Sequence, residues 1–247
     1  MCIDPVFTTL AIMSLSPLPK IRAITFDLDD TLWDARPALL RAEQVQQAWI
    51  VEHAPRLAAA HDIESLRRWR WDLARQHPEV AHDFTALRIL ALREQLVAFA
   101  YDPALAEPGI ALFVRERSVV TLYDDVVPVL SDLARDFTLV ALTNGNADLE
   151  VAGVSPYFAF CISPAEAGVQ KPDPRMFEVA LARLGVSAAC AVHVGDQPLY
   201  DIEGARRAAL ASVWVNRHGE PWPDDYARPH AEIASLTELR AALMRIV

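Results

Sequence analysis

Two carboxylates, Asp27 and Asp29, follow a short apolar run and are separated by one residue. The run, Ile21 to Phe26, is typical of a buried strand, so both side chains are expected at a strand end, facing one crevice. Carboxylates this close repel each other unless a cation or a shared proton relieves the repulsion. Leu32 and Ala38 stand where a calcium-binding loop needs glycine and glutamate, which disfavours such a loop. A solvated acidic turn is the alternative for this segment alone.

Three further segments carry polar groups that could act in the same place. Thr143 lies in LTNGN, Lys171 in KPDP, and Asp196 and Asp201 in GDQPLYD. A hydroxyl and nearby backbone N–H groups can hold a phosphate oxygen. Taken singly, each segment has another interpretation. LTNGN also fits a hairpin turn, KPDP a stiff loop with a solvated lysine, and GDQPLYD a turn in which Asp201 caps a helix.

Each of these segments follows a predicted strand, and the ends of parallel strands share one edge of a sheet. We therefore expect the carboxylates, the threonine and the lysine to converge. Hard oxygen ligands of this kind suit Mg²⁺, which keeps several waters and bridges to phosphate. In such a site one carboxylate can attack phosphorus while the lysine and the metal offset negative charge.

Apolar, β-branched runs alternate with helical patterns over most of the chain. The predicted strands are Ile21 to Phe26, Phe137 to Thr143, Phe158 to Ile162, Ala191 to Val194 and Ser212 to Val215. The helical patterns between them are Val126 to Arg135, Pro174 to Leu184 and Tyr200 to Ala209. This alternation predicts an α/β, Rossmann-like, three-layer core with a parallel sheet covered on both faces.

The alternation stops after the first strand. Four helical stretches fill the gap: Pro37 to Glu52, Ile63 to Gln76, Asp83 to Ala100 and Gly109 to Val119. Asp62 and Asp83 are the expected N-caps of two of them. We predict a helical cap over residues 36–120, a catalytic core over 20–35 and 121–247, and an N-terminal extension over 1–19.

Composition limits the classes of partner. The chain has 247 residues, with 33 acids against 23 bases and a formal net charge of −10, which disfavours a nucleic-acid partner. No apolar run approaches the ~18 residues that span a bilayer, so no membrane association is expected. Three cysteines without a CxxC pair predict a reduced, cytoplasmic protein. The expected partner is a small phosphorylated metabolite, and the expected assembly is a monomer or a homodimer.

The ordered set DLDDT, LTNGN, KPDP and GDQPLYD resembles the four motifs of the haloacid dehalogenase superfamily, from about residue 20 to the end. The helical insertion resembles its C1-type cap. The resemblance implies that Asp27 is the nucleophile and Asp29 the general acid and base. It also implies that Asp27, the Asp29 carbonyl and Asp196 bind Mg²⁺. Asp201 is then a carboxylate beside these ligands that does not itself bind the ion. Thr143, Asn144 and Lys171 are the implied phosphate-binding residues.

Comparison with the superfamily pattern disfavours two of its reactions. Halide-displacing members lack the acid that stands here as Asp29, so dehalogenation is disfavoured. Members that cleave a carbon–phosphorus bond use a cap lysine, whereas the only lysines here are Lys20 and Lys171. A phosphomutase and a sugar-phosphate or nucleotide phosphatase of the same superfamily stay open, and a non-catalytic phosphate-binding protein is disfavoured by Asp27 and Asp29. Further likeness, in residues 26–37, His82-Asp83 and residues 143–147, is to bacterial phosphatases of flavin mononucleotide and of 5-amino-6-(5-phospho-ribitylamino)uracil.

The predicted cap contains residues that could contact a flat heterocycle. Trp33, Arg70 and neighbouring tryptophans offer aromatic and guanidinium faces for stacking, and His82 is a candidate to face the crevice. The alternative is that these tryptophans are helix core and that the arginine lies along the surface.

Overall fold

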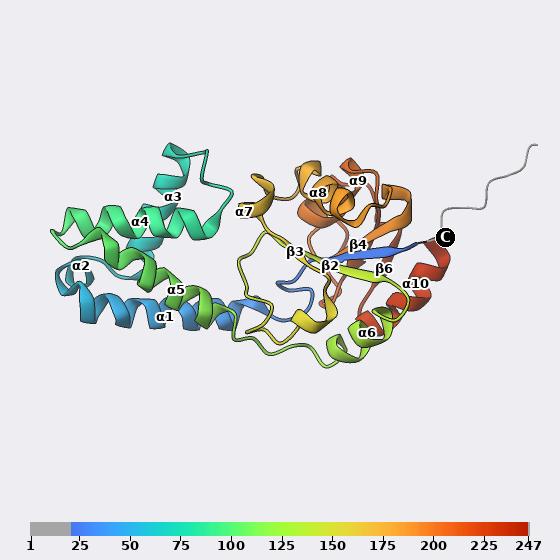
Figure 1. The fold of residues 1–247 in the computed structure, drawn as a ribbon, viewed down its shortest axis with the longest axis horizontal. Coiled ribbons are helices and arrows are strands. Elements are labelled where there is room, and N and C mark those ends of the chain that lie inside the picture. Colours follow the sequence, from blue (N-terminus) through green and yellow to red (C-terminus); the bar gives the residue numbers. More distant parts are fainter. Residues whose placement is uncertain (1–20, 247) are drawn as a thin grey trace, which may run out of the picture.

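A computed structural model describes residues 21–246, and the expected N-terminal extension (1–19) and Lys20 lie outside the described residues. Its centre is a six-stranded parallel sheet with the order β3-β2-β1-β4-β5-β6 (Figure 1). The strands are β1 (Ala23–Phe26), β2 (Thr138–Leu142), β3 (Cys161–Ile162), β4 (Ala191–Gly195), β5 (Ala211–Val215) and β6 (Ala231–Ile233). The predicted α/β, Rossmann-like fold is confirmed.

The central strands match the sequence prediction better than the edge strands do. β1 is buried along its whole length and pairs with both β2 and β4, which agrees with its mainly apolar sequence. β3 is shorter than predicted, because only Cys161 and Ile162 pair in register with β2. The sequence prediction missed β6, whose three residues include an exposed glutamate and form no apolar run.

Helices cover both faces of the sheet. α6 (Val126–Leu133) and α10 (Leu239–Ile246) pack on one face, within the larger apolar core. α8 (Pro174–Leu184) and the short α9 (Gly204–Arg207) pack on the other face, and Figure 1 shows these two pairs on opposite sides of the strands. The four-residue α7 (Pro164–Ala167) precedes α8. A π-helical segment, Pro198–Glu203, replaces the first part of the helix predicted from Tyr200.

The chain between β1 and α6 forms a helical lobe beside the sheet, on the left in Figure 1. Its helices are α1 (Ala35–His53), α2 (Pro55–Ala60), α3 (Ile63–Gln76), α4 (Phe84–Ala98) and α5 (Ala106–Arg117). They enclose their own apolar cluster, which includes Ile50, Leu92 and Ile110. Asp62 and Asp83 cap α3 and α4 as predicted, because each carboxylate accepts hydrogen bonds from backbone N–H groups of the first turn. The short α2 was not predicted.

None of the helices in residues 21–246 combines the length and the apolar composition that a membrane crossing requires.

Gly195 ends β4 where the backbone passes close to the Asp201 side chain. A Cβ added there would overlap the Asp201 carboxyl group. We predict that Gly195→Ala lowers the free energy of unfolding by about 1–3 kcal/mol, because a well-packed interior must shift to accept the methyl group. Urea denaturation followed by circular dichroism measures the change. An unaltered midpoint would contradict the expected crowding.

Candidate active site

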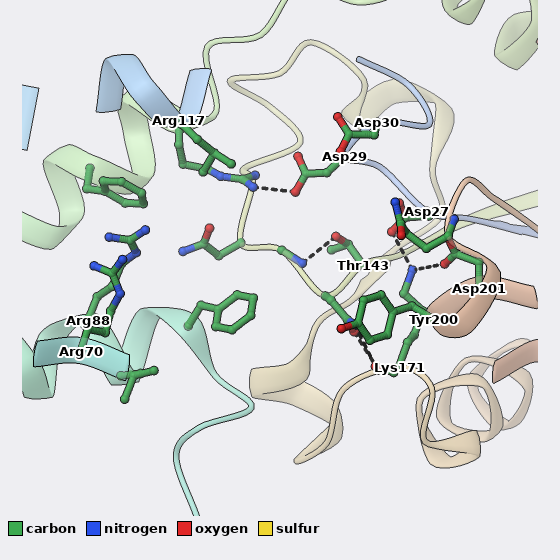
Figure 2. A pocket seen from close by; sticks show the side chains of 18 of the residues that line it. Asp27, Asp29, Asp30, Arg70, Arg88, Arg117, Thr143, Lys171, Tyr200 and Asp201 are labelled. Carbon is green, nitrogen blue, oxygen red and sulfur yellow. Dashed lines mark hydrogen bonds and ion pairs between the residues drawn. The ribbon is translucent and has the colours of Figure 1, made fainter. Parts of the chain in front are cut away.

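The predicted chemical residues gather at the carboxyl ends of three adjacent strands. Asp27 directly follows β1, Thr143 follows β2 and Asp196 follows β4, while Lys171 lies on the loop between α7 and α8. Because the strands are parallel, these ends share one edge of the sheet. Asp27, Thr143 and Lys171 line a cavity of about 400 Å³ between the sheet and the helical lobe, shown in Figure 2.

Lys171 is the charged group at the base of this cavity, and its side chain is only 1 % exposed. Its Nζ donates to Asp27 Oδ1 and to Asp201 Oδ1, both at 2.6 Å. Burial opposes the charge on the ammonium, but the two carboxylates outweigh it and raise the pKa of Lys171 above its ordinary range. For Asp27, burial is the largest influence and raises its pKa well above the usual value, although the lysine acts in the opposite direction.

Asn144 holds the backbone of Lys171 in place. Its Oδ1 accepts from Lys171 N at 2.7 Å, and its Nδ2 donates to Lys171 O at 3.0 Å. Asn144 lines the cavity, but its amide group is already engaged on both sides. The side-chain amide of Asn144 therefore positions the lysine, and phosphate binding by the Asn144 backbone N–H group stays a prediction.

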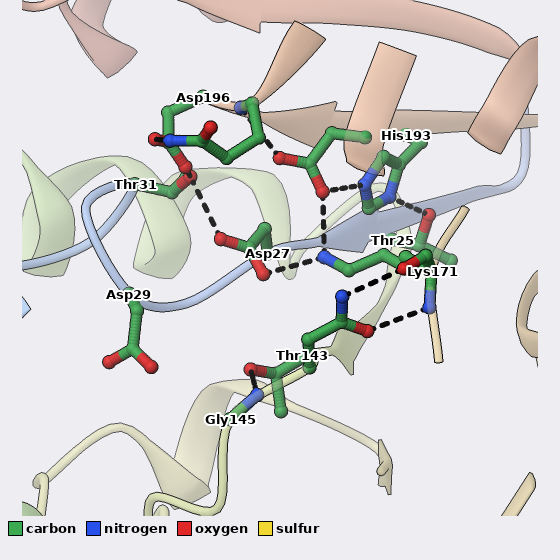
Figure 3. A network of polar contacts seen from close by, with 12 residues as sticks. Thr25, Asp27, Asp29, Thr31, Thr143, Gly145, Lys171, His193 and Asp196 are labelled. Atoms are coloured by element: carbon green, nitrogen blue, oxygen red, sulfur yellow. Dashed lines mark hydrogen bonds and ion pairs between the residues drawn. The ribbon is translucent and has the colours of Figure 1, made fainter. Parts of the chain in front are cut away.

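Asp201 is fully buried and accepts hydrogen bonds from the protein interior. Besides Lys171, His193 Nε2 lies 3.1 Å from Asp201 Oδ1, and Gln197 N donates to Oδ2 at 2.8 Å. Thr25 Oγ1 and His193 Nδ1, 2.8 Å apart, extend this chain of contacts between the neighbouring strands β4 and β1 (Figure 3). The alternative in which Asp201 is the N-cap of a helix is wrong, because Asp201 lies inside the segment Pro198–Glu203, whose N-cap is Gln197.

Asp196 and Asp27 form the part of the site that fits a metal ion. One oxygen from each of Asp27, Asp196 and Asp201 lies within 4.8 Å of the others. Burial, followed by the Asp201 charge, raises the pKa of Asp196 to about 7. Two carboxyl groups that resist ionisation in this way are the donor set that a hard divalent cation stabilises. Asp201 is already engaged by Lys171, His193 and Gln197. Asp196 has fewer donors of this kind, so Asp27 and Asp196 fit a metal ion best.

Asp29 is held by two donors that belong to other parts of the chain. Trp33 Nε1 donates to Asp29 Oδ1 at 2.9 Å, and Arg117 Nη2 donates to Asp29 Oδ2 at 2.6 Å. Arg117, the last residue of α5, is 3 % exposed. Gly145 has to be small here, because a Cβ would lie 2.5 Å from Asp29 Oδ2 and 3.1 Å from Arg117 Nη2. These contacts fix the direction of the carboxylate.

Trp33 agrees with the core alternative rather than with stacking on a ligand. The whole residue is 0 % exposed, so no ring face is open to a ligand. Its indole N–H is the part that matters to the site, since it orients Asp29. Trp69, another tryptophan considered for stacking, packs against the edge of His61 instead.

Thr143 and the loop after it shape the cavity floor. Thr143 is almost fully buried, and its Oγ1 accepts from Gly145 N at 2.9 Å. The hydroxyl proton of Thr143 is then available to a ligand oxygen. Asn146 Nδ2 donates to Thr85 Oγ1 at 2.9 Å, which ties this loop to the first turn of α4.

The helical lobe supplies the wall opposite these residues. Arg70 lines the cavity as expected, together with Trp71, whereas His82 is not among the lining residues. Sequence reasoning missed Arg88 and Arg117, which also line it. A signal was present for both: Arg88 follows Phe84 at i+4, and Arg117 follows Phe113 at i+4, so each arginine shares a helix face with an apolar residue.

Comparison with known proteins agrees with this geometry. The sequence model of the haloacid dehalogenase-like hydrolases matches residues 21–209. One relative is the 5-amino-6-(5-phospho-D-ribitylamino)uracil phosphatase YigB of Escherichia coli, 32 % identical over 92 % of this chain and 98 % of that protein. Another is a phosphoserine phosphatase of Thermus thermophilus, 36 % identical over 60 % of this chain and 61 % of that one.

A solved structure is also similar over nearly the whole chain. It is described as a 2-haloacid dehalogenase from Pseudomonas syringae and has a TM-score of 0.87 and 40 % identity. The match covers 92 % of this chain and 100 % of the other. From the matched sequence model and these relatives, the chain belongs to the haloacid dehalogenase-like hydrolases.

Proposed function

We propose that this hydrolase is a Mg²⁺-dependent phosphomonoester phosphatase that acts through an aspartyl-phosphate on Asp27. The observation that carries the proposal is the Lys171 ammonium, 2.6 Å from Asp27 Oδ1, at the base of a cavity that Asp29 also lines. A fixed positive charge beside a carboxylate is what a transferring phosphoryl group needs for charge stabilisation. Named phosphatases among the relatives support the same reaction.

The reaction proceeds in two displacements at phosphorus. An Asp27 oxygen bonds to phosphorus as the bond from phosphorus to the leaving oxygen breaks, and Asp29 gives that oxygen a proton. Asp29 then takes a proton from water, whose oxygen bonds to phosphorus and releases Asp27. Lys171 and Thr143 hold the phosphoryl oxygens. Trp33 and Arg117 keep the Asp29 carboxyl aimed at the leaving oxygen, because each donates to one of its oxygens.

Asp27, Asp196 and the Asp29 backbone carbonyl would hold the Mg²⁺ ion. When bound, the ion offsets charge on the two buried carboxylates and on the transferring group. Asp201 supports this arrangement indirectly, since its Oδ1 accepts a hydrogen bond from Lys171 Nζ.

The helical lobe acts as a cap in this proposal. Residues 36–120 would form the cap, and residues 20–35 with 121–247 the catalytic core. Support comes from the separate apolar cluster of the lobe and from the cavity, which residues of both parts line. A cap that closes over the cavity keeps bulk water from the reacting phosphorus.

We propose flavin mononucleotide or 5-amino-6-(5-phospho-ribitylamino)uracil as the substrate, a small phosphorylated metabolite in either case. The similarity to YigB over nearly the whole chain supports this class. Trp71, Phe84 and Tyr200 supply aromatic surface along the cavity, which suits a flat heterocycle. The similarity to a 2-haloacid dehalogenase structure makes halide displacement the second candidate, and Asp29 argues against it.

The deciding experiment is a substrate screen with Asp27→Asn as its control. The unaltered protein should release phosphate from flavin mononucleotide and the uracil precursor in Mg²⁺, without isomerised products. Asp27→Asn should lose nearly all turnover while circular dichroism shows an unchanged fold, since an amide is a poor nucleophile. Full turnover in that variant would contradict the mechanism. Chloride release from 2-chloropropionate would favour the dehalogenase instead.

Mg²⁺ should stabilise the folded protein through Asp196. At 100 times its dissociation constant a ligand adds about 2.7 kcal/mol, which differential scanning calorimetry detects as a higher melting temperature. The ion binds the ionised carboxyl, and the pKa of Asp196 is about 7. The half-saturating Mg²⁺ concentration should therefore fall as pH rises from 6 to 8.

Asp196→Asn should remove most of this Mg²⁺ effect. Asp132→Asn, which alters a carboxylate on α6 that pairs with Arg240, is the matched control and should keep the effect. An equal Mg²⁺ response in all three proteins would rule out the assigned metal site.

Lys171→Arg should impair turnover although the charge is kept. The planar guanidinium is larger than the ammonium, and the space around Lys171 Nζ is closed by two carboxylates at 2.6 Å. We expect kcat to fall by about 10²–10³, the size of effect seen when one stabilising donor is misplaced. Steady-state kinetics measures the loss, and turnover within twofold of the unaltered protein would refute the close fit.

Trp33→Phe tests the positioning of Asp29, because it keeps the ring and removes the N–H donor. The kcat for an alkyl phosphate should fall by about tenfold, whereas an activated aryl phosphate needs less help from an acid and should lose less. Trp69→Phe is the matched control, since Trp69 packs on His61 instead. Equal losses for both kinds of substrate would speak against a role through Asp29.

A further inference from the structure

The cavity wall opposite Asp27 and Lys171 carries two arginines that the proposed chemistry does not use. Arg70 comes from α3 and Arg88 from α4, and Figure 2 shows them lying beside each other across the cavity from the catalytic residues. Arg117 also lines this region, and its Nε and Nη1 have no hydrogen-bond partner among the described residues, but its Nη2 is paired with the Asp29 carboxylate, which compensates its charge. Arg70 and Arg88 are therefore the arginines of this wall whose charge a ligand could meet.

Arg88 has no anionic partner within residues 21–246. No carboxylate lies within ion-pairing distance of it, and its buried Nη1 has no hydrogen-bond partner. The guanidinium lies 3.7 Å from the centre of the Phe113 ring, which fixes its position. Burial, followed by repulsion from Arg70, lowers the pKa of Arg88 well below its usual value. Glu43 acts on this charge only from beyond ion-pair distance, so the folded chain compensates the guanidinium weakly.

Arg70 is only weakly compensated. Its Nη2 lies 3.9 Å from Glu43 Oε1, which is longer than a hydrogen bond. Glu43 is engaged instead by Arg67, whose Nη2 is 2.5 Å from Glu43 Oε2. Burial lowers the pKa of Arg70 as well. One carboxylate therefore serves both Arg67 and Arg70, and the local charge stays positive.

A buried, unpaired guanidinium is costly, and Arg88 could avoid that cost only by reaching water or an anion. Its buried Nη1 shows that water does not fully solvate it here. A planar guanidinium fork binds two oxygen acceptors in one plane better than it binds a single point charge. The cavity between the arginines and Lys171 is bordered by apolar Leu39, Phe84 and Leu87. The arginine end is thus cationic, the middle is apolar, and the opposite end holds Lys171 among carboxylates.

We propose that Arg70 and Arg88 bind paired oxygen acceptors at the end of the substrate remote from its phosphate. This inference rests on the proposed phosphatase function, which places the phosphate at Lys171. Two groups present such acceptors: a carboxylate, and the two carbonyls of a pyrimidinedione ring. A phosphomonoester with a bare hydrocarbon leaving group lacks them and is selected against.

Arg88→Met tests the inference, with Arg93→Met as the matched control. Arg93 lies on the same helix, is exposed and pairs with Glu107, outside the cavity. The substrates are flavin mononucleotide, which carries the dione, phosphoserine, which carries a carboxylate, and phenyl phosphate, which carries neither. Arg88→Met should lower kcat/KM for one of the first two at least ten times more than for phenyl phosphate, mainly through KM. The substrate with the larger loss identifies the acceptor group.

Equal losses of kcat/KM for all three substrates, or no loss for any, would overturn the inference. A purely structural role for Arg88 would also predict a lower unfolding midpoint in Arg88→Met. We expect the midpoint to stay equal or rise, because methionine removes an uncompensated buried charge at similar volume.

Binding without turnover separates this inference from the proposed function. In an Asp27→Asn background, Arg88→Met should weaken binding of flavin mononucleotide or phosphoserine at least ten times more than binding of inorganic phosphate. Flavin fluorescence and calorimetry measure these affinities. If the unaltered protein hydrolyses none of the phosphomonoesters, the proposed function fails. If Arg88→Met weakens all three ligands equally or none, the arginine site fails.

Discussion

The buried ammonium of Lys171 is the interaction on which the rest of the site depends. It lies between Asp27 and Asp201 at 2.6 Å from each, and all three groups are almost closed to solvent. Removing one member of such a group leaves an uncompensated buried charge, which costs about 3–5 kcal/mol. The surrounding contacts keep these three charged groups together. Asn144 hydrogen-bonds to the Lys171 backbone, and His193 Nε2 contacts Asp201 Oδ1.

The two sides of the cavity carry opposite charges. The sheet side carries a carboxylate cluster that favours a cation, with the pKa values of Asp27 and Asp196 raised by burial. The helical side carries guanidinium groups, among which Arg88 has no partner in the described chain. The whole protein is acidic, with a net charge of −10. The positive region is therefore local, which suits a small anionic ligand rather than a polyanion.

Arg117 connects the two sides. It ends α5, the last helix of the lobe, and its Nη2 reaches Asp29 on the loop after β1. The Asn146 to Thr85 hydrogen bond joins the same two parts at a second point. Any displacement of the helical lobe from the sheet changes both contacts. In the proposed mechanism, closure of the cap over the cavity would therefore also set the orientation of Asp29.

The sequence alone determined the central strands, most of the helices and the convergence of Asp27, Thr143, Lys171 and Asp196. These follow from local patterns, because apolar runs predict strands, and parallel strands necessarily bring their carboxyl ends to one edge. Short edge strands were predicted poorly, since β3 and β6 have too few apolar residues to form a clear run.

Only the tertiary structure decided what surrounds Asp29 and which arginines face the ligand. The Arg117 contact joins residues 88 positions apart, and no local pattern encodes a pairing at that distance. Trp33 changed from a stacking candidate to a buried donor because its burial depends on packing from several elements. The role of Arg88 likewise depends on the fold, because only the tertiary structure shows that no carboxylate of the described chain forms an ion pair with it.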